Sequence, residues 1–253
     1  GIRPRRRKSD RLVNKPVDGN PPDAQHRVLR LSVHSDSTLG INADETENPH
    51  KRDHMINNDV SHLAGNPVLT AIRNRRTVRE FLDTPVPRNV LERVIEAATW
   101  APNHRITDPW RFIVLQHGDK ARVEVAQLIH DWTLNNIPNP NQVTRKKSAE
   151  SAQREILDSP SFIYVYSVPG ANEEVTRENY AAVCCAVMNL SLAAYAEGLG
   201  VGWSTGKATK PGDLAELIGA DLSWDVVGAL FIGYPAHVPD RQPKGLDHCA
   251  SWL

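Results

Sequence analysis

The stretch "TRENYAAVCCAVMNLSLAAYAEGLG", residues 176–200, is the longest regular apolar pattern in the chain. Small and aliphatic residues occupy nearly every helical position, and Gly198 and Gly200 follow as residues typical of a helix end. A helix that is apolar on almost all sides has to be buried on all of them. We therefore expect this helix at the centre of the domain or in an interface between two copies, where its small residues permit close approach.

Helical and strand-like segments alternate around this stretch. Asn66 and Pro67 form a typical helix start, as cap and first helical residue. A polar stretch at about 135–150 is predicted to be flexible. The mixture predicts an α+β or α/β layered domain. The patterns predict helices at 66–76, 86–102, 120–136, 176–200 and 212–219, and buried strands at 110–116, 161–169 and 225–235.

Composition excludes several classes of protein. The chain has 253 residues, and its 30 Lys and Arg balance its 30 Asp and Glu, so no overall positive charge attracts nucleic acid. The apolar run within 181–196 is broken by Asn189 and Ser191 and is too short for a membrane helix. Three cysteines, Cys184, Cys185 and Cys249, form neither a disulfide framework nor a metal motif. A cytoplasmic protein with no metal and no membrane partner is expected.

Residues 1–65 differ from the rest of the chain. They open with "RPRRRK", are rich in Asp, Asn, Ser and Pro, and show no periodicity, so we expect a disordered or poorly ordered extension. Its basic start fits a solvated tail better than a contact with nucleic acid or a membrane. Met55 is the first methionine, which suggests that residues 1–54 are an extension or a gene-model artefact. Residues 66–253 are then the folded domain.

Two segments carry polar side chains suited to binding. In "NRRTVREFLDTPVP" (74–87), Arg75, Arg76 and Arg79 are either a solvated helix end or a cup for a phosphate. In "ATWAPNHRITDPWRFIVL" (98–115), a polar loop joins a helix to a buried strand, a common place for a ligand site. The glycines of "GLGVGW" close a helix rather than open one, so they predict helix termination and a tight turn rather than a dinucleotide site. Cys184 and Cys185 are expected in the core.

Five segments in order, "RNRRTVREF", "AATWAPNHRITDPWRFIVL", "AEGLGVGWSTG", "VVGALFIGYP" and "DRQPKGLDHCASW", resemble the nitroreductase family over about residues 66–253. The resemblance implies an α+β fold with a central, mostly antiparallel sheet flanked by helices. It also implies an intertwined homodimer with FMN at its interface. The implied activity is an FMN-dependent oxidoreductase that uses NAD(P)H to reduce a small organic acceptor, such as a nitroaromatic or a quinone, by ping-pong hydride transfer.

The resemblance also implies site residues. Arg75, Arg76 and Thr77 match the segment that grips the FMN phosphate, and a phosphate dianion suits guanidinium forks and a hydroxyl donor. Near the C-terminus, Arg241 and Lys244 match a basic pair that completes the phosphate site, although a solvated tail has the same composition.

Further positions correspond to the flavin ring and ribityl chain. His104 and Asp108 match loop positions that meet them, and Arg105 is a candidate cation near N1. The family has Gln or Asn where this chain has Asp108. We therefore expect the carboxylate beside N3 or a ribityl hydroxyl, away from negative charge on the reduced ring. The loop expected over the ring edge near N5 holds Trp203, Ser204 and Thr205.

Two other functions stay open from the sequence. The same fold can serve a flavin-dependent dehydrogenase or dehalogenase, and Asp108 is the one residue that favours this. A protein of another class would bind flavin without catalysis and contact nucleic acid through its basic arm, which the near-zero charge disfavours. The stretch 135–150 is expected to form part of a substrate lid. The sequence fixes neither the acceptor nor the choice between NADH and NADPH.

Overall fold

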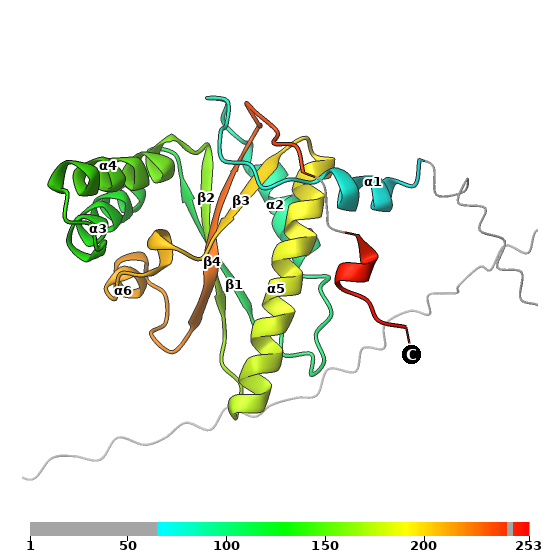
Figure 1. Ribbon diagram of the computed structural model, residues 1–253. Coiled ribbons are helices and arrows are strands. Elements are labelled where there is room, and N and C mark those ends of the chain that lie inside the picture. Colours follow the sequence, from blue (N-terminus) through cyan, green and yellow to red (C-terminus); the bar gives the residue numbers. More distant parts are fainter. Residues whose placement is uncertain (1–64, 242–244, 253) are drawn as a thin grey trace, which may run out of the picture. The chain divides into compact units, whose positions relative to one another are not determined.

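The computed structural model describes residues 65–241 and 245–252 (Figure 1). The predictions for the extension before Gly65 and for Lys244 lie outside these residues. The helices are α1 (Pro67–Asn74), α2 (Arg88–Ala98), α3 (Lys120–Asn136), α4 (Gln142–Asp158), α5 (Glu173–Ala196) and α6 (Leu214–Ile218). The strands are β1 (Trp110–Gln116), β2 (Ser161–Ser167), β3 (Gly200–Ser204) and β4 (Asp225–Gly233), and the 3₁₀ turns are η2 (Lys207–Thr209) and η3 (Leu246–His248).

The four strands form one sheet in the order β1-β2-β4-β3, and every neighbouring pair is antiparallel. This confirms the predicted α+β class and the antiparallel sheet. In the central strand β2, every residue is buried, because both faces of the sheet are covered. Alternate side chains enter different cores: Ile163 and Val165 face α2 and α5, whereas Phe162 and Tyr164 face α3 and α6.

Helix α5 packs along one face of the sheet and against α2, as its composition predicts (Figure 1). It is not buried on every side of the single chain, because Tyr180 and Met188 are 38% and 48% exposed. The cysteine prediction is correspondingly wrong in part: Cys184 is half-buried but Cys185 is exposed. Among the described helices, α5 alone is long and apolar enough to cross a membrane: it has 24 residues, and an 18-residue window within it has a mean hydropathy of 1.3. Here it serves as a core helix.

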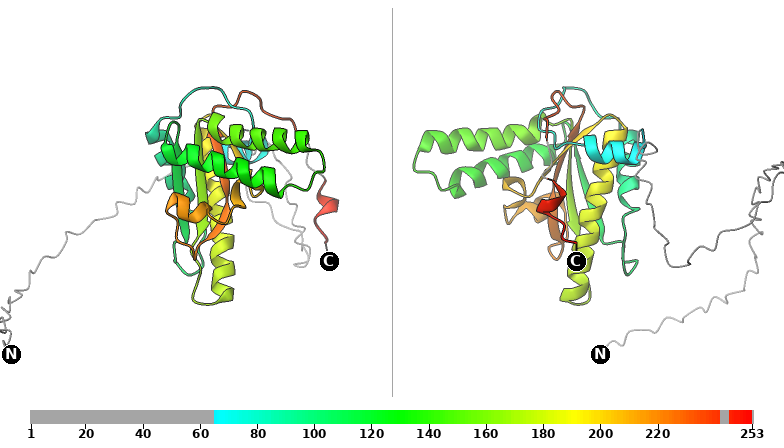
Figure 2. Two further views of the ribbon diagram at one scale, coloured as in Figure 1. Left: turned by 90° about the vertical axis from the view of Figure 1, so that its left-hand side faces the viewer. Right: turned by 45° about the vertical axis from the view of Figure 1, so that its right-hand side comes forward.

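Helices α3 and α4 form a hairpin on the other face, extending away from the sheet (Figure 2). The prediction of a flexible stretch at 135–150 is therefore wrong for most of its length. Asn141 caps α4 by accepting a hydrogen bond from the Thr144 N–H at 3.1 Å. The buried stripe of α4 consists of only Ala149, Ala152 and Ile156, and two alanines and one isoleucine give a weak periodic signal within a polar helix.

The end of α5 and the start of β3 share a glycine-rich turn. Gly198 has φ +75°, the left-handed conformation that ends helices, so the predicted helix termination is correct. Gly200 and Gly202, in contrast, lie inside β3, a fourth strand that the sequence patterns do not predict. A strand of five residues that includes two glycines lacks the alternation by which strands are recognised.

Candidate functional site

The segment after α1 is held against the sheet by backbone pairing. Asn66 caps α1 by accepting the N–H groups of Val68 and Leu69, as predicted. Beyond α1 the chain becomes extended, and Thr77 forms a parallel bridge with Val201 of β3. The following residue, Val78, donates its N–H to the Val201 carbonyl at 3.1 Å.

These contacts place the predicted phosphate residues beside the edge strand. Arg75 and Arg76 are half-buried, and Thr77 is exposed. Burial lowers the pKa of Arg75, and the positive charges of Arg76 and Arg241 lower it further. Arg241 is thus close enough to act on Arg75, although about 165 residues separate them in the sequence, so the structure brings these two predicted groups together.

The arginine cluster of Arg75, Arg76 and Arg241 has an excess of unneutralised charge. In the described part of the chain, none of the three forms an ion pair. Arg76 donates from Nη1 to the carbonyls of Arg73 and Arg75, at 2.6 and 3.0 Å, but its Nε is buried with no described partner. Two half-buried arginines and an exposed one, all without a carboxylate partner, and an orphaned guanidinium donor suit an anion such as a phosphate.

A second group of predicted residues lies further along the same strand. Trp203 and Ser204 belong to β3 rather than to a loop, which corrects the prediction, and Thr205 is the exposed residue just after it. The Trp203 indole lies against Gly228 and donates from Nε1 to the Val227 carbonyl at 3.3 Å. From Val201 to Ser204 the strand rises about 10 Å. The arginine cluster and this strand end are therefore parts of one edge.

Lys207 and Ser148 join this second group, and sequence reasoning missed both. Ser204 and Lys207 line a hollow of about 190 Å³ between β3, α3 and α4. The Lys207 Nζ lies 3.3 Å from the Ser148 hydroxyl of α4. The lysine stands in a stretch that resembles a phosphate-binding loop only poorly, and α4 was not predicted as a helix. The sequence therefore gave no signal that these residues meet.

The third group is the loop 103–108, where His104, Arg105 and Asp108 are all exposed. Arg105 forms an ion pair with Glu178 of α5 at 2.7 Å, and this hydrogen bond raises the pKa of Arg105. Asp108 accepts a hydrogen bond from the Asn103 amide at 3.1 Å. Its φ is +44°, in the left-handed region that non-glycine residues seldom adopt outside turns and functional sites.

Within one chain this loop does not reach the arginine cluster. Glu178, which holds the loop, lies near the start of α5, whereas α1 lies beside the C-terminal end of α5 (Figures 1 and 2). At 1.5 Å per residue, some 20 Å of helix separates the two levels. The loop also precedes β1, and the cluster lies beside β3, at opposite edges of the sheet. Within a single chain the two groups of predicted residues are thus separate.

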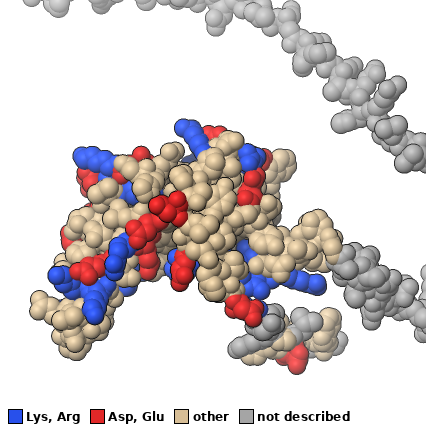
Figure 3. Space-filling model, turned by 90° about the horizontal axis from the view of Figure 1, so that it is seen from above, with Lys and Arg blue, Asp and Glu red and all other residues tan. Residues whose placement is uncertain are grey.

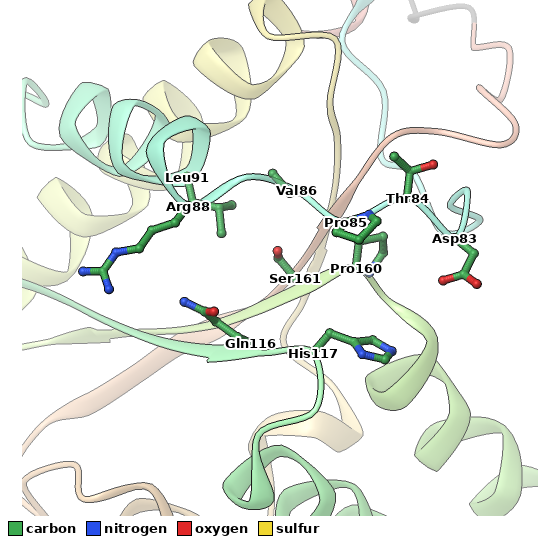
Figure 4. A pocket seen from close by; sticks show the side chains of 10 residues that line it. All are labelled: Asp83, Thr84, Pro85, Val86, Arg88, Leu91, Gln116, His117, Pro160 and Ser161. Carbon is green, nitrogen blue, oxygen red and sulfur yellow. The ribbon is translucent and has the colours of Figure 1, made fainter.

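A further hollow in the described chain is lined by none of the predicted residues. It has a volume of about 470 Å³ and lies where β1 ends and β2 begins (Figure 4). Elsewhere, basic and acidic side chains alternate on the face seen in Figure 3, so no single basic field appears there. The residues at 65–241 and 245–252 contain no cluster of three or more His, Cys, Asp or Glu suited to a metal.

Comparison with known proteins settles the family. The model of the nitroreductase family matches residues 72–234, well over half of the chain. The chain belongs to the nitroreductase family. YfhC of Bacillus subtilis, named as an NAD(P)H nitroreductase, is 29% identical over 173 residues, which cover 68% of this chain and 87% of YfhC. Membership confirms the resemblance drawn from the sequence motifs and the oxidoreductase class of this family member.

Solved structures of family members agree with the fold. A nitroreductase-like family protein from Bacillus cereus superposes with a TM-score of 0.62 at 27% identity, over 74% of this chain and 95% of the other. A nitroreductase-type protein from Desulfovibrio desulfuricans, solved in complex with FMN, gives a TM-score of 0.60 at 24% identity. That match covers 74% of this chain and 97% of the other, and it supports the fold of this family member.

One glycine allows the segment after α1 to lie this close to β3. A Cβ on Gly202 would stand 2.4 Å from the Val78 carbonyl oxygen, a backbone atom that cannot move aside. Gly202→Ala is expected to lower the unfolding temperature by several degrees, corresponding to roughly 1–3 kcal/mol of strain. Thermal unfolding of this variant, with Gly212→Ala as control because nothing lies within 4 Å of Gly212, checks the prediction. Equal unfolding temperatures would contradict it.

Proposed function

We propose that this nitroreductase family member is an FMN-dependent oxidoreductase that uses NAD(P)H to reduce a small organic acceptor. The observation that carries the proposal is the arginine cluster: three cations, one with its pKa lowered by burial and by the other two, and an orphaned guanidinium donor. Such a cluster destabilises the chain unless a multiply charged anion neutralises it. The FMN phosphate supplies that charge, and the Thr77 hydroxyl is exposed beside it as a further donor.

The order of the predicted residues along β3 supports an orientation of FMN along this strand. The phosphate belongs at Arg75, Arg76 and Arg241, and the ring belongs toward Trp203, Ser204 and Thr205, about one ribityl chain further along the strand. When bound, FMN supplies a two-electron carrier between NAD(P)H and the acceptor. The chain's own groups bind and orient it and limit the access of water; no side chain is required as a nucleophile.

The separation of these two groups of residues supports a homodimer. The loop with His104, Arg105 and Asp108 can meet a flavin held by the arginine cluster only if a second chain presents the loop. Apolar side chains remain exposed on the helices that such a partner would cover, namely Val68 and Ile72 of α1 and Tyr180 and Met188 of α5. We propose that two chains pack through α1 and α5 and share two flavin sites, and we keep the cytoplasmic setting as a prediction.

The visible absorption spectrum of the purified protein tests this function. We expect flavin bands near about 370 and 450 nm, which the cofactor sets, and their loss on anaerobic addition of NADPH. Regeneration of the bands by a nitroaromatic or a quinone would then identify an acceptor and support ping-pong turnover. Bands that persist with both NADH and NADPH would reject the reductase and favour a dehydrogenase, a dehalogenase or a non-catalytic flavin protein. A colourless protein that FMN cannot reconstitute would reject flavin binding.

A further inference from the structure

The 470 Å³ hollow at the end of β1 is lined by none of the residues assigned to the flavin; Figure 4 shows the residues that line it. Four separate segments build it: residues 83–86, the first turn of α2, the end of β1, and the start of β2. Its volume lies within the range of small-molecule sites in proteins. Helix α2 and the two strands are elements of the core, so the walls are fixed by packing.

One wall of this hollow is apolar and the opposite side donates hydrogen bonds. Val86, Leu91 and Pro160 supply the apolar wall. Ser161 faces this wall, and only 2% of its surface is exposed. The Ser161 carbonyl accepts from the Ser159 hydroxyl at 3.1 Å, and the Ser161 hydroxyl is not among the buried atoms of the described chain that lack a partner. Figure 4 shows this hydroxyl directed into the hollow, toward α2. A hydroxyl at the wall of a hollow can donate a hydrogen bond to a ligand bound there.

The positively and negatively charged side chains lie at opposite ends of the hollow. Arg88 and Gln116 lie together at one end, and Asp83 lies at the other (Figure 4). Arg88 begins α2, whose N-cap Pro87 provides no side-chain cap, so the partial positive charge of the helix start adds to that end. Arg88 pairs with Glu92 at 2.8 Å, but both side chains are highly exposed, so the pair is weak and the guanidinium can turn to a ligand.

We propose that this hollow is a second binding site and that it takes a small monocarboxylic acid with a compact apolar body. Arg88, Gln116 and the Ser161 hydroxyl receive the carboxylate, and the apolar wall receives the body. Asp83 disfavours a second negative charge at the far end, so dicarboxylates bind less well. Binding here involves no covalent step and is independent of the proposed flavin chemistry.

Titration of the purified full-length protein with benzoate tests this site, followed by NMR of the His117 ring, which lines the hollow. Benzoate should shift the His117 signals saturably and leave the flavin absorption unchanged, whereas neutral benzamide and the dianion phthalate should bind at least several-fold more weakly. Arg88→Gln should weaken benzoate binding roughly tenfold, the effect of one charge-assisted hydrogen bond. Glu92→Gln, also at an exposed position, should strengthen it by releasing Arg88.

Three results would overturn the proposal: no saturable shift of His117, equal binding of benzamide, or equal affinities in the Arg88→Gln and Glu92→Gln variants. Both substitutions are at exposed positions of α2, so neither depends on rebuilding the core. Because His117 reports on the hollow whether or not flavin is bound, this outcome is separate from the fate of the proposed flavin function.

Discussion

Arg75→Gln combined with Arg76→Gln is expected to weaken FMN binding by roughly 100- to 1000-fold. Each guanidinium lost removes charge-assisted hydrogen bonds to the phosphate, and hydrogen bonds to charged groups contribute about 1.5–3 kcal/mol each. Because the two arginines repel one another without an anion, the substitutions should also leave the flavin-free chain as stable as before, or slightly more stable. Fluorescence titration with FMN measures the first effect, and thermal unfolding of the flavin-free protein measures the second.

The matched control is Arg154→Gln, an exposed arginine of α4 without an ion pair. It removes one positive charge from the chain but lies outside the arginine cluster, so FMN affinity should be unchanged. If this control weakened FMN as much as either arginine of the cluster did, the effect would be one of overall charge, and the phosphate assignment would fail.

Arg122→Met is expected to destabilise the fold by roughly 3–5 kcal/mol, the cost of leaving buried polar groups unpaired. Arg122, on α3, is 1% exposed, and burial lowers its pKa to about 10, so it remains charged at neutral pH. Its guanidinium donates to the carbonyls of Ile156, Leu157 and Ser159, where α4 ends and the chain turns into β2. Methionine fills the space but leaves these carbonyls without donors.

Thermal unfolding of the flavin-loaded protein measures this effect, with Arg122→Lys as the informative comparison. Lysine keeps the charge and can reach part of the carbonyl set, so its loss should be smaller than that of methionine. A methionine variant as stable as the parent chain would mean that the carbonyls find other donors, and that the α3–α4 hairpin does not depend on this arginine.

The sequence predicts the elements whose patterns are strong. The apolar runs of β2 and β4, which are buried on both faces, and the capped start of α1 each leave a local signature. The run at 110–116 correctly predicts strand β1, but the expectation that this strand is buried is wrong, because β1 lies at the edge of the sheet and only Trp110 and Leu115 are buried. Two elements are missed, each for its own reason. Helix α4 is polar, and its buried face holds only two alanines and one isoleucine. Strand β3 is short and contains Gly200 and Gly202. Both depend on contacts with distant parts of the chain, which no local window records.

The residues of the candidate site also divide into those that the sequence predicted and those that depend on distant contacts. The approach of Arg241 to Arg75 agrees with the resemblance, because family motifs preserve which residues share a ligand. Lys207 and Ser148 were not predicted, since their contact depends on α4. Ser161 was not predicted either, because a serine at the start of a buried strand has an ordinary structural explanation until its place at the wall of the hollow is seen in three dimensions.

The most direct test of the central claim is the ratio of the affinities for FMN and for riboflavin, which differ only in the phosphate. If Arg75, Arg76 and Arg241 form the phosphate site, the flavin-depleted protein should prefer FMN by roughly 100-fold or more. The preference should largely disappear in the Arg75→Gln, Arg76→Gln variant, while riboflavin binding stays nearly constant. Equal affinities for FMN and riboflavin in the unsubstituted protein would contradict the account, because the arginine cluster would then serve no phosphate.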